Sequence, residues 1–196
     1  NKVYSNLREA NTARQAVWDT ANVIDIYWRL NELGGEVGEV CNLLKKWDRE
    51  MIGLPGSRTT RAAIMEEMAD VIICCDLVMM HLNQSEVLFS FGGQRGPDQR
   101  MLASEGVMML EHVGMACEAY LSYKLGNVSL HVAKLVHRTA ITAANFASPR
   151  ELEVAISKKF NKTSHAVNLP VFLDLNYRIA DDYVDPITGE KMPGKA

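Results

Sequence analysis

Apolar side chains recur every three or four residues along most of this chain, which is the spacing of one face of an α-helix. The pattern predicts six helices, over residues 6–20, 23–51, 60–83, 99–123, 129–146 and 148–167. The last one begins with Ser148-Pro149-Arg150-Glu151, a capping box with proline at the first helical position. Beyond Leu169 the helical period stops. The predicted fold class is therefore all-α, a helical bundle with an extended C-terminal tail.

At 196 residues the chain is long enough for one domain with a sizeable core. The expected parts are a single domain over 1–168, an inserted helical pair over about 91–147 that opens with a loop at 91–97, and a tail over 169–196. A degenerate repeat is the alternative for 91–147, because Val113-Gly114-Met115-Ala116-Cys117 can be laid over Val37-Gly38-Glu39-Val40-Cys41. Coincidence explains three identical residues equally well.

Composition excludes several classes of function. A formal charge of -3 argues against a broad surface for nucleic acid or anionic membranes. No apolar run approaches the roughly eighteen residues of a membrane span. The four cysteines lie in apolar helical patterns without CxxC spacing, which is typical of reduced core thiols in a cytosolic protein. We therefore expect a cytoplasmic protein without a nucleic-acid or membrane partner.

Two acidic motifs carry the candidate chemistry, Glu36-Val37-Gly38-Glu39 and Glu67-Met68-Ala69-Asp70. Each places two carboxylates three residues apart in a predicted helix, and such residues project from the same side. In both helices the carboxylates lie roughly 70° and 130° from the centre of the apolar face, on the same flank. Antiparallel packing of the two helices would therefore bring the motifs together. Four clustered carboxylates favour a hard divalent cation, with Mg²⁺ first and Mn²⁺ as a substitute.

The alternative is that these acids only solvate the surface, as Glu does on many helices. Two details favour a metal site instead. The acids alternate with small and apolar residues, an unusual setting for plain solvation. Gly38 is costly inside a helix, and the close approach of a ligand or another backbone would explain it.

With these motifs the chain resembles the MazG-like group of all-α nucleoside triphosphate pyrophosphohydrolases, whose signature is ExxE, about two dozen residues, and then ExxD. The surrounding stretches 36–46 and 66–73 fit as well, and 158–164 looks like the closing basic helix of that family. The resemblance covers residues 25–83 and 150–168. The stretch from about 91 to 147 departs from the family pattern.

The resemblance implies an enzyme in which Glu36, Glu39, Glu67 and Asp70 bind Mg²⁺. Such enzymes cleave a nucleoside triphosphate to the monophosphate and pyrophosphate. We take dGTP or another purine deoxynucleotide as the expected substrate. The resemblance also implies a homodimer or higher homo-oligomer, because family members usually complete their pockets between subunits.

Residues outside the two motifs are candidates for substrate binding. Charge on the leaving pyrophosphate would be compensated by Lys159 and Lys162, with Asn161 donating a hydrogen bond. Near the end of the second helix, Lys46 and Trp47 are further candidates, with Trp47 either stacking on a base or packing in the core. Glu66 is either a base that acts behind the metal ligands or a residue facing solvent. Trp28 either lines a base pocket or lies in the core.

Two other classes of protein compete with this hypothesis. One is a non-catalytic helical-bundle interaction protein whose acidic face binds an ion or a partner. The other is a di-iron carboxylate bundle, which is disfavoured because its ExxH ligand motifs are missing.

Overall fold

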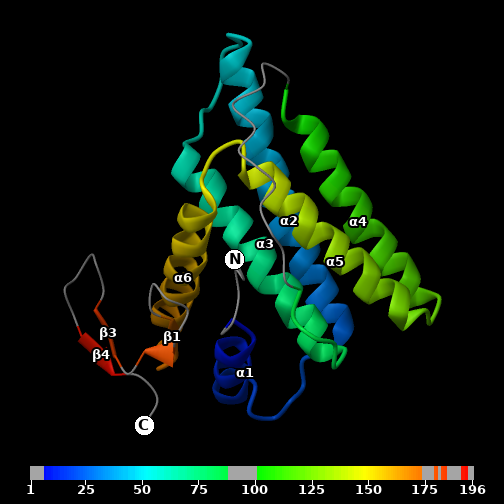
Figure 1. Ribbon diagram of the computed structural model, residues 1–196, viewed down its shortest axis with the longest axis vertical. Helices are drawn as coiled ribbons and strands as arrows, with labels where there is room; N and C mark the ends of the chain where they lie inside the picture. Colours follow the sequence, from blue (N-terminus) through cyan, green and yellow to red (C-terminus); the bar gives the residue numbers. More distant parts are fainter. Residues whose placement is uncertain (1–6, 88–100, 174–178, 181, 185–190, 194–196) are drawn as a thin grey trace.

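The computed structural model describes residues 7–87, 101–173, 179–180, 182–184 and 191–193. It contains the six helices α1 Leu7–Trp18, α2 Ile26–Met51, α3 Arg61–His81, α4 Ala103–Leu121, α5 Leu125–Ala143 and α6 Pro149–Ala166 (Figure 1). The all-α prediction is confirmed, and each predicted helix is present. None of the described helices combines the length and apolar character that crossing a membrane requires. The predicted loop at 91–97 lies outside the described residues.

Side-chain caps explain where three helices begin. Asp25 accepts a hydrogen bond from the Trp28 backbone N–H at the start of α2, and Thr60 accepts one from Ala63 at the start of α3. At α6 the predicted capping box between Ser148 and Glu151 is present in both directions. These caps satisfy backbone donors that have no partner inside the helix.

The start of α5 refines the sequence prediction, and a glycine pair inside α2 shows the effect of packing. Helix α5 begins at Leu125, one turn before the predicted residue 129. Gly126 and Asn127 lie in its first turn, where the backbone N–H groups need no intrahelical partner and weak helix formers are tolerated. Helix α2 continues through Gly34 and Gly35 without interruption, because tertiary packing outweighs a cost of about 1 kcal/mol for each glycine.

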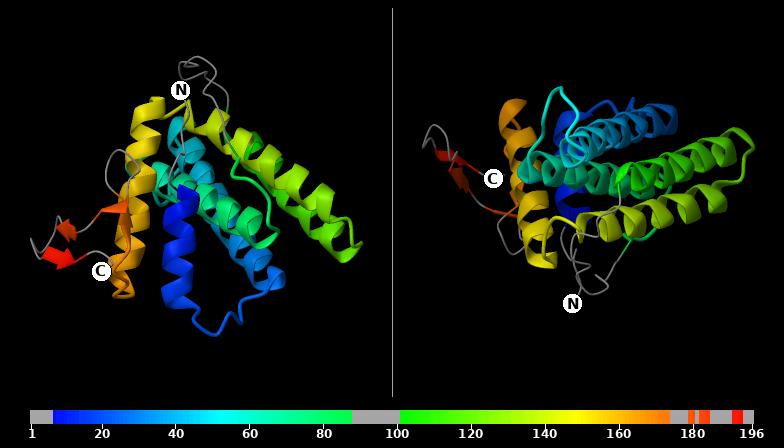
Figure 2. Two further views of the ribbon diagram at one scale, coloured as in Figure 1. Left: turned by 60° about the horizontal axis from the view of Figure 1, so that its bottom comes forward. Right: turned by 90° about the horizontal axis from the view of Figure 1, so that it is seen from above.

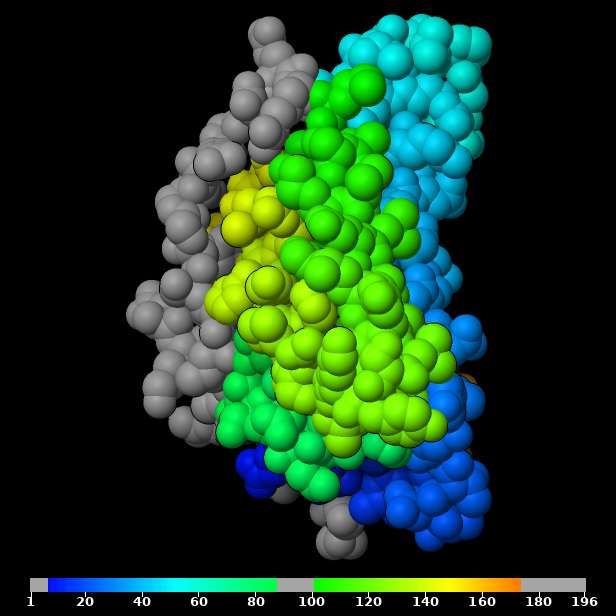
Figure 3. Space-filling model, turned by 90° about the vertical axis from the view of Figure 1, so that its right-hand side faces the viewer, coloured from blue at the N-terminus to red at the C-terminus, as the bar shows by residue number. Residues whose placement is uncertain are grey.

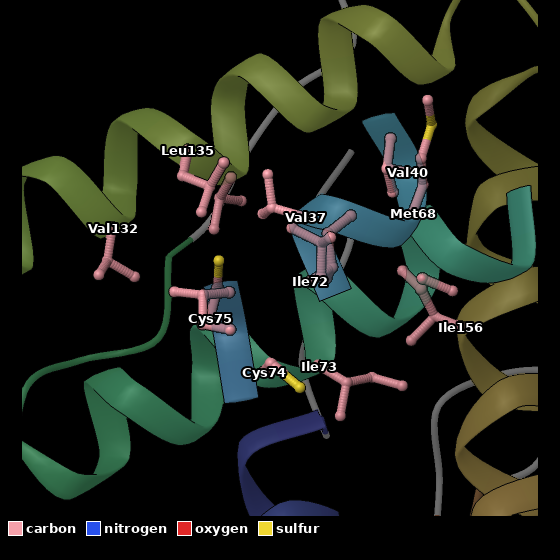
Figure 4. Close-up of a cluster of buried hydrophobic side chains, with 14 of the residues drawn as sticks. Val37, Val40, Met68, Ile72, Ile73, Cys74, Cys75, Val132, Leu135 and Ile156 are labelled. Carbon is pink, nitrogen blue, oxygen red and sulfur yellow. The ribbon is translucent and has the colours of Figure 1, made fainter. Parts of the chain in front are cut away.

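Two antiparallel hairpins, α2–α3 and α4–α5, form a four-helix bundle. Helix α2 packs on α4 and α3 packs on α5, while α1 and α6 pack on α3 (Figures 1 and 2). The apolar faces meet in one core that includes Val37, Met68, Ile72 and Leu135 (Figure 4). Asp48 near the end of α2 accepts hydrogen bonds from two backbone N–H groups at the start of α4, which ties the hairpins together.

The predicted extended tail contains short strands, namely β1 Phe172–Leu173, β2 Ile179–Ala180, β3 Asp182–Val184 and β4 Lys191–Pro193. Strands β1 and β2 pair antiparallel, as do β3 and β4. Strand β1 is buried against α6 and α1 of its own chain. The beginning of the tail is therefore part of the core that supports α6.

Candidate metal centre

Helices α2 and α3 bring three of the four predicted carboxylates together. One oxygen each from Glu36, Glu67 and Asp70 lies within 4.8 Å of the others. The antiparallel hairpin causes this meeting, because both acidic motifs lie on the flanks of apolar faces that pack together. The fourth predicted residue, Glu39, is exposed at the edge of the group and is a hydrogen-bond neighbour of Glu67.

Partial burial and mutual repulsion make this group electrostatically unfavourable without a cation. Burial, followed by the charges of Asp70, Glu39 and Glu67, raises the pKa of Glu36 to about 7. The pKa values of Glu67 and Asp70 are raised too, again chiefly by burial. A divalent cation between these oxygens would relieve the repulsion, and an all-oxygen set of ligands suits Mg²⁺ or Mn²⁺. The donor set therefore fits the predicted metal.

Helix α6 places a lysine against the same carboxylates. The Lys159 ammonium lies 2.6 Å from Asp70 and 3.3 Å from Glu66. Burial opposes the charged lysine, but its bond to Asp70 and the nearby carboxylates prevail and raise its pKa. Lys162, one turn further along, also pairs with Glu66. Of the two lysines predicted to bind pyrophosphate, Lys159 thus contacts the acidic group directly, and Lys162 contacts the neighbouring Glu66.

Glu66 occupies a different setting from either prediction made for it. It is half-buried and accepts from both Lys159 and Lys162, so it does not simply face solvent. Burial tends to raise its pKa, but the two lysines lower it overall. A carboxylate held by two ammonium groups is a weak base, and Glu66 therefore orients the lysines.

Two charged residues near the centre were not singled out from the sequence. Glu32 lies one turn before Glu36 on α2, and burial, with a smaller contribution from the Asp70 charge, raises its pKa. Arg14 of α1 is buried, donates to the Phe160 carbonyl oxygen at 2.9 Å, and interacts electrostatically with Asp70. The four-residue spacing from Glu32 to Glu36 was a usable signal. Arg14 had none, because its role depends on where α1 docks.

Asn161 does not take the role predicted for it. Its side chain is buried, donates to the Leu173 carbonyl oxygen at 2.7 Å and accepts from the Leu173 backbone N–H at 2.7 Å. Side chains two positions apart on a helix point in directions that differ by roughly 200°, so Asn161 points away from the side that carries Lys159. It anchors β1 to α6 and is not available to a phosphate group.

We expect Asn161→Ala to lower the free energy of unfolding by roughly 2–4 kcal/mol, because it leaves a buried donor and a buried acceptor of Leu173 without partners. Urea denaturation followed by circular dichroism measures this change. Asn161→Asp, which keeps the acceptor and loses the donor, should fall between the wild type and the alanine variant. A loss of catalytic activity with unchanged stability would restore the ligand role and contradict this assignment.

The two candidate substrate residues near the end of α2, Lys46 and Trp47, have different surroundings. The Trp47 ring is half-buried against the core and meets Phe146 edge to face, with ring centroids 5.1 Å apart. Of the two alternatives for Trp47, the structure places it in core packing rather than over an open pocket. Lys46 is half-buried and lies two turns beyond Glu39, on the same side of α2.

Two cavities flank the acidic group at opposite ends along α3. The larger, about 540 Å³, lies between α3 and α6 and presents Arg61, Lys158, Lys159 and Lys162 over an apolar floor. The smaller, about 130 Å³, is lined by aromatic and polar or charged side chains, including Arg14, Gln15, Trp18, Trp28, Arg29 and Glu32. The centre therefore lies between a cationic cavity and an aromatic one.

The described part of the chain does not cover Gly38. A Cβ atom added at Gly38 would meet nothing within 4 Å in the described part of the chain. The predicted close approach of a backbone is thus not made within this chain, and the exposed glycine leaves the surface between Glu36 and Glu39 open.

The raised pKa of Glu36 gives a stability prediction. The folded state binds this proton more tightly than the unfolded chain, with pKa values of about 7 and 4.5, so stability decreases as pH rises through that window. Without divalent cations near pH 8, we expect Glu36→Gln to stabilise the fold by about 1–2 kcal/mol, discounted for solvent screening. Thermal denaturation in chelator, at about pH 5 and pH 8, measures this. An equal effect at both pH values would contradict the assignment.

Comparison with protein-family models, curated proteins and solved structures gives no match for this chain.

Proposed function

We propose that this protein is a Mg²⁺-dependent nucleoside triphosphate pyrophosphohydrolase that releases the nucleoside monophosphate and pyrophosphate. The observation that carries the proposal is the acidic group of Glu36, Glu67 and Asp70, with Lys159 of α6 paired to Asp70 and Lys162 paired to the neighbouring Glu66. Carboxylates that gather a divalent cation, next to ammonium groups, suit a substrate with several phosphates.

In this proposal Glu36, Glu67 and Asp70 hold Mg²⁺, and Glu39 completes the set from the open edge. Bound Mg²⁺ supplies neutralisation of the triphosphate charge and activation of water for in-line attack. Glu66 keeps Lys159 and Lys162 oriented toward the centre.

The cavities support a direction for the substrate. The cationic cavity suits the departing pyrophosphate, because Lys159 and Lys162 line it and carry compensating charge. The aromatic cavity suits the base, because the exposed rings of Trp18 and Trp28 offer stacking surfaces. A large purine would use more of that surface than a pyrimidine, in keeping with dGTP or a related deoxynucleotide.

The decisive experiment incubates the full chain with each of the eight common ribo- and deoxynucleoside triphosphates and Mg²⁺, and measures pyrophosphate and orthophosphate separately. We expect pyrophosphate as the first product, activity with Mn²⁺, and none in chelator. Orthophosphate as the primary product would refute the proposed bond cleavage. Metal binding without turnover of any nucleotide would favour the non-catalytic interaction protein instead.

The homodimer implied by the resemblance stays a prediction. Sedimentation velocity across a range of protein concentrations tests it directly, with a single species at the mass of one chain as the contrary result.

A further inference from the structure

The two hairpins of the bundle correspond position by position. When 76 is added to the residue number, residues 35–42 of α2 correspond to residues 111–118 of α4. Along these two stretches exposed, half-buried and buried residues occur in the same order. With a shift of 64, four buried residues of α3 correspond to four buried residues of α5. These pairs are Ile64 with Val128, Met68 with Val132, Val71 with Leu135, and Ile72 with Val136.

Contacts across the bundle follow the same correspondence. Each helix packs on its own counterpart, α2 on α4 and α3 on α5, as a two-fold relation requires. The Cys41 thiol contacts the Gly106 carbonyl oxygen at 3.4 Å, and their counterparts, Cys117 and Leu30, line one shared cavity. The weak sequence repeat around Val37 and Val113 therefore coincides with a structural one. Figure 3 shows the side of the molecule on which the second hairpin lies.

The correspondence places new residues at the position of the metal centre. Under the two shifts, Glu36 corresponds to His112 and Glu67 corresponds to His131. The two imidazole rings are stacked between α4 and α5, with centroids 6.5 Å apart and planes 25° from parallel. The second hairpin thus brings two imidazoles together where the first brings two carboxylates.

Both imidazoles have an unused nitrogen inside the protein. His131 is only 8% exposed. The Nδ1 atoms of His112 and His131 are buried, and neither has a hydrogen-bond partner in the described part of the chain. A buried polar atom without a partner is costly, and a bound ligand would satisfy it.

We propose that His112 and His131 form a second metal site that binds a borderline transition-metal ion of the Zn²⁺, Ni²⁺ or Cu²⁺ class. Imidazole nitrogen is a preferred ligand of these ions, whereas Mg²⁺ prefers oxygen. Zn²⁺ binds imidazole nitrogen at about 2.0–2.1 Å and in the plane of the ring, so rings that share one ion have centroids roughly 5–6 Å apart. The stacked rings must therefore turn about their side-chain torsions until one nitrogen of each points at the ion. Water completes the remaining positions.

The charged residues around the two histidines reduce the electrostatic repulsion that a bound cation would meet there. Arg138 is committed to Glu105 by an ion pair of 3.2 Å, and Lys134, the counterpart of Asp70, is exposed and can turn into solvent. Glu111, whose charge acts on His112, offsets part of the positive potential. The two metal sites differ in donor atoms, so the second site is independent of the proposed hydrolysis.

The test titrates Zn²⁺ into chelator-treated full-length protein in excess Mg²⁺, which occupies the oxygen site, and follows binding by competition with a chromogenic chelator. We expect binding to weaken at least about tenfold in His112→Gln and in His131→Asn, and to be unchanged in Asp70→Asn. His112 is only half-buried, so its variant keeps the test valid should the His131 variant fail to fold.

Electron paramagnetic resonance of one equivalent of Cu²⁺ gives a readout that does not depend on activity. We expect hyperfine coupling to two nitrogen donors, lost in His112→Gln. Coupling to oxygen donors alone would overturn the proposal, as would Zn²⁺ binding that is lost in Asp70→Asn and kept in the histidine variants. Binding of inorganic phosphate at this position without Zn²⁺ would also overturn it.

Discussion

Asp70→Asn is expected to lower the Mg²⁺-dependent release of pyrophosphate by at least about a hundredfold. Asp70 is the residue at which the acidic group and Lys159 meet, and its oxygens lie near those of Glu36 and Glu67. The amide has the same shape without the negative charge, so the change removes a proposed metal ligand and leaves the packing intact. Loss of several kcal/mol of charge stabilisation corresponds to this factor. Initial rates at saturating nucleotide, over a series of Mg²⁺ concentrations, measure it.

Glu50→Gln is the matched control for that experiment. Glu50 is an exposed carboxylate near the end of α2, and no role at the metal centre is assigned to it. The control should retain wild-type activity and metal dependence. If both variants keep activity, the acidic group is not the site of the chemistry. Circular dichroism of each variant separates a folding defect from a catalytic one.

Lys159→Met is expected to reduce turnover about 10- to 100-fold and, unlike Asp70→Asn, to lower the Mg²⁺ concentration that gives half of the maximal rate. The Lys159 ammonium lies 2.6 Å from Asp70 and lines the cationic cavity, so under the proposed function it competes with Mg²⁺ for the Asp70 carboxylate. Methionine keeps the length and the apolar stem and removes the charge. A fall in turnover together with a fall in the Mg²⁺ requirement is the signature of this double role.

Lys45→Met is the corresponding control, because Lys45 is exposed on α2. This substitution changes the net charge of the protein by the same amount as Lys159→Met. It should leave both quantities unchanged. A Lys159 variant with normal turnover would remove this lysine from the proposed substrate site. One that needs more Mg²⁺ would show that Lys159 supports metal binding and does not compete with it.

Much of the architecture was predictable because helix formation follows a local pattern. Apolar spacing identified the six helices found among the described residues, and the capping box at Ser148 marked the start of α6. The grouping of the carboxylates within each motif could also be predicted from the sequence, since residues three apart on a helix project from the same side whatever surrounds them. A short connection between α2 and α3 then made their antiparallel packing the expected arrangement.

The errors have a common physical cause. Asn161 was assigned to the substrate as part of the basic stretch 158–164, and the role of Trp47 stayed open between stacking on a base and packing in the core. Their partners, Leu173 and Phe146, come from other elements, and a polar or aromatic side chain takes its role from the neighbours that folding provides. The ion pairs of Glu66 were missed for the same reason.

The sequence by itself determined the helices, their apolar faces and the spacing of the two acidic motifs, because each depends on interactions within a few residues. Only the tertiary structure decided that α6 docks where Lys159 meets Asp70, and that α4 and α5 bring His112 beside His131. Those encounters depend on which apolar faces pack together. Faces built from similar aliphatic residues do not encode their partners in periodicity alone.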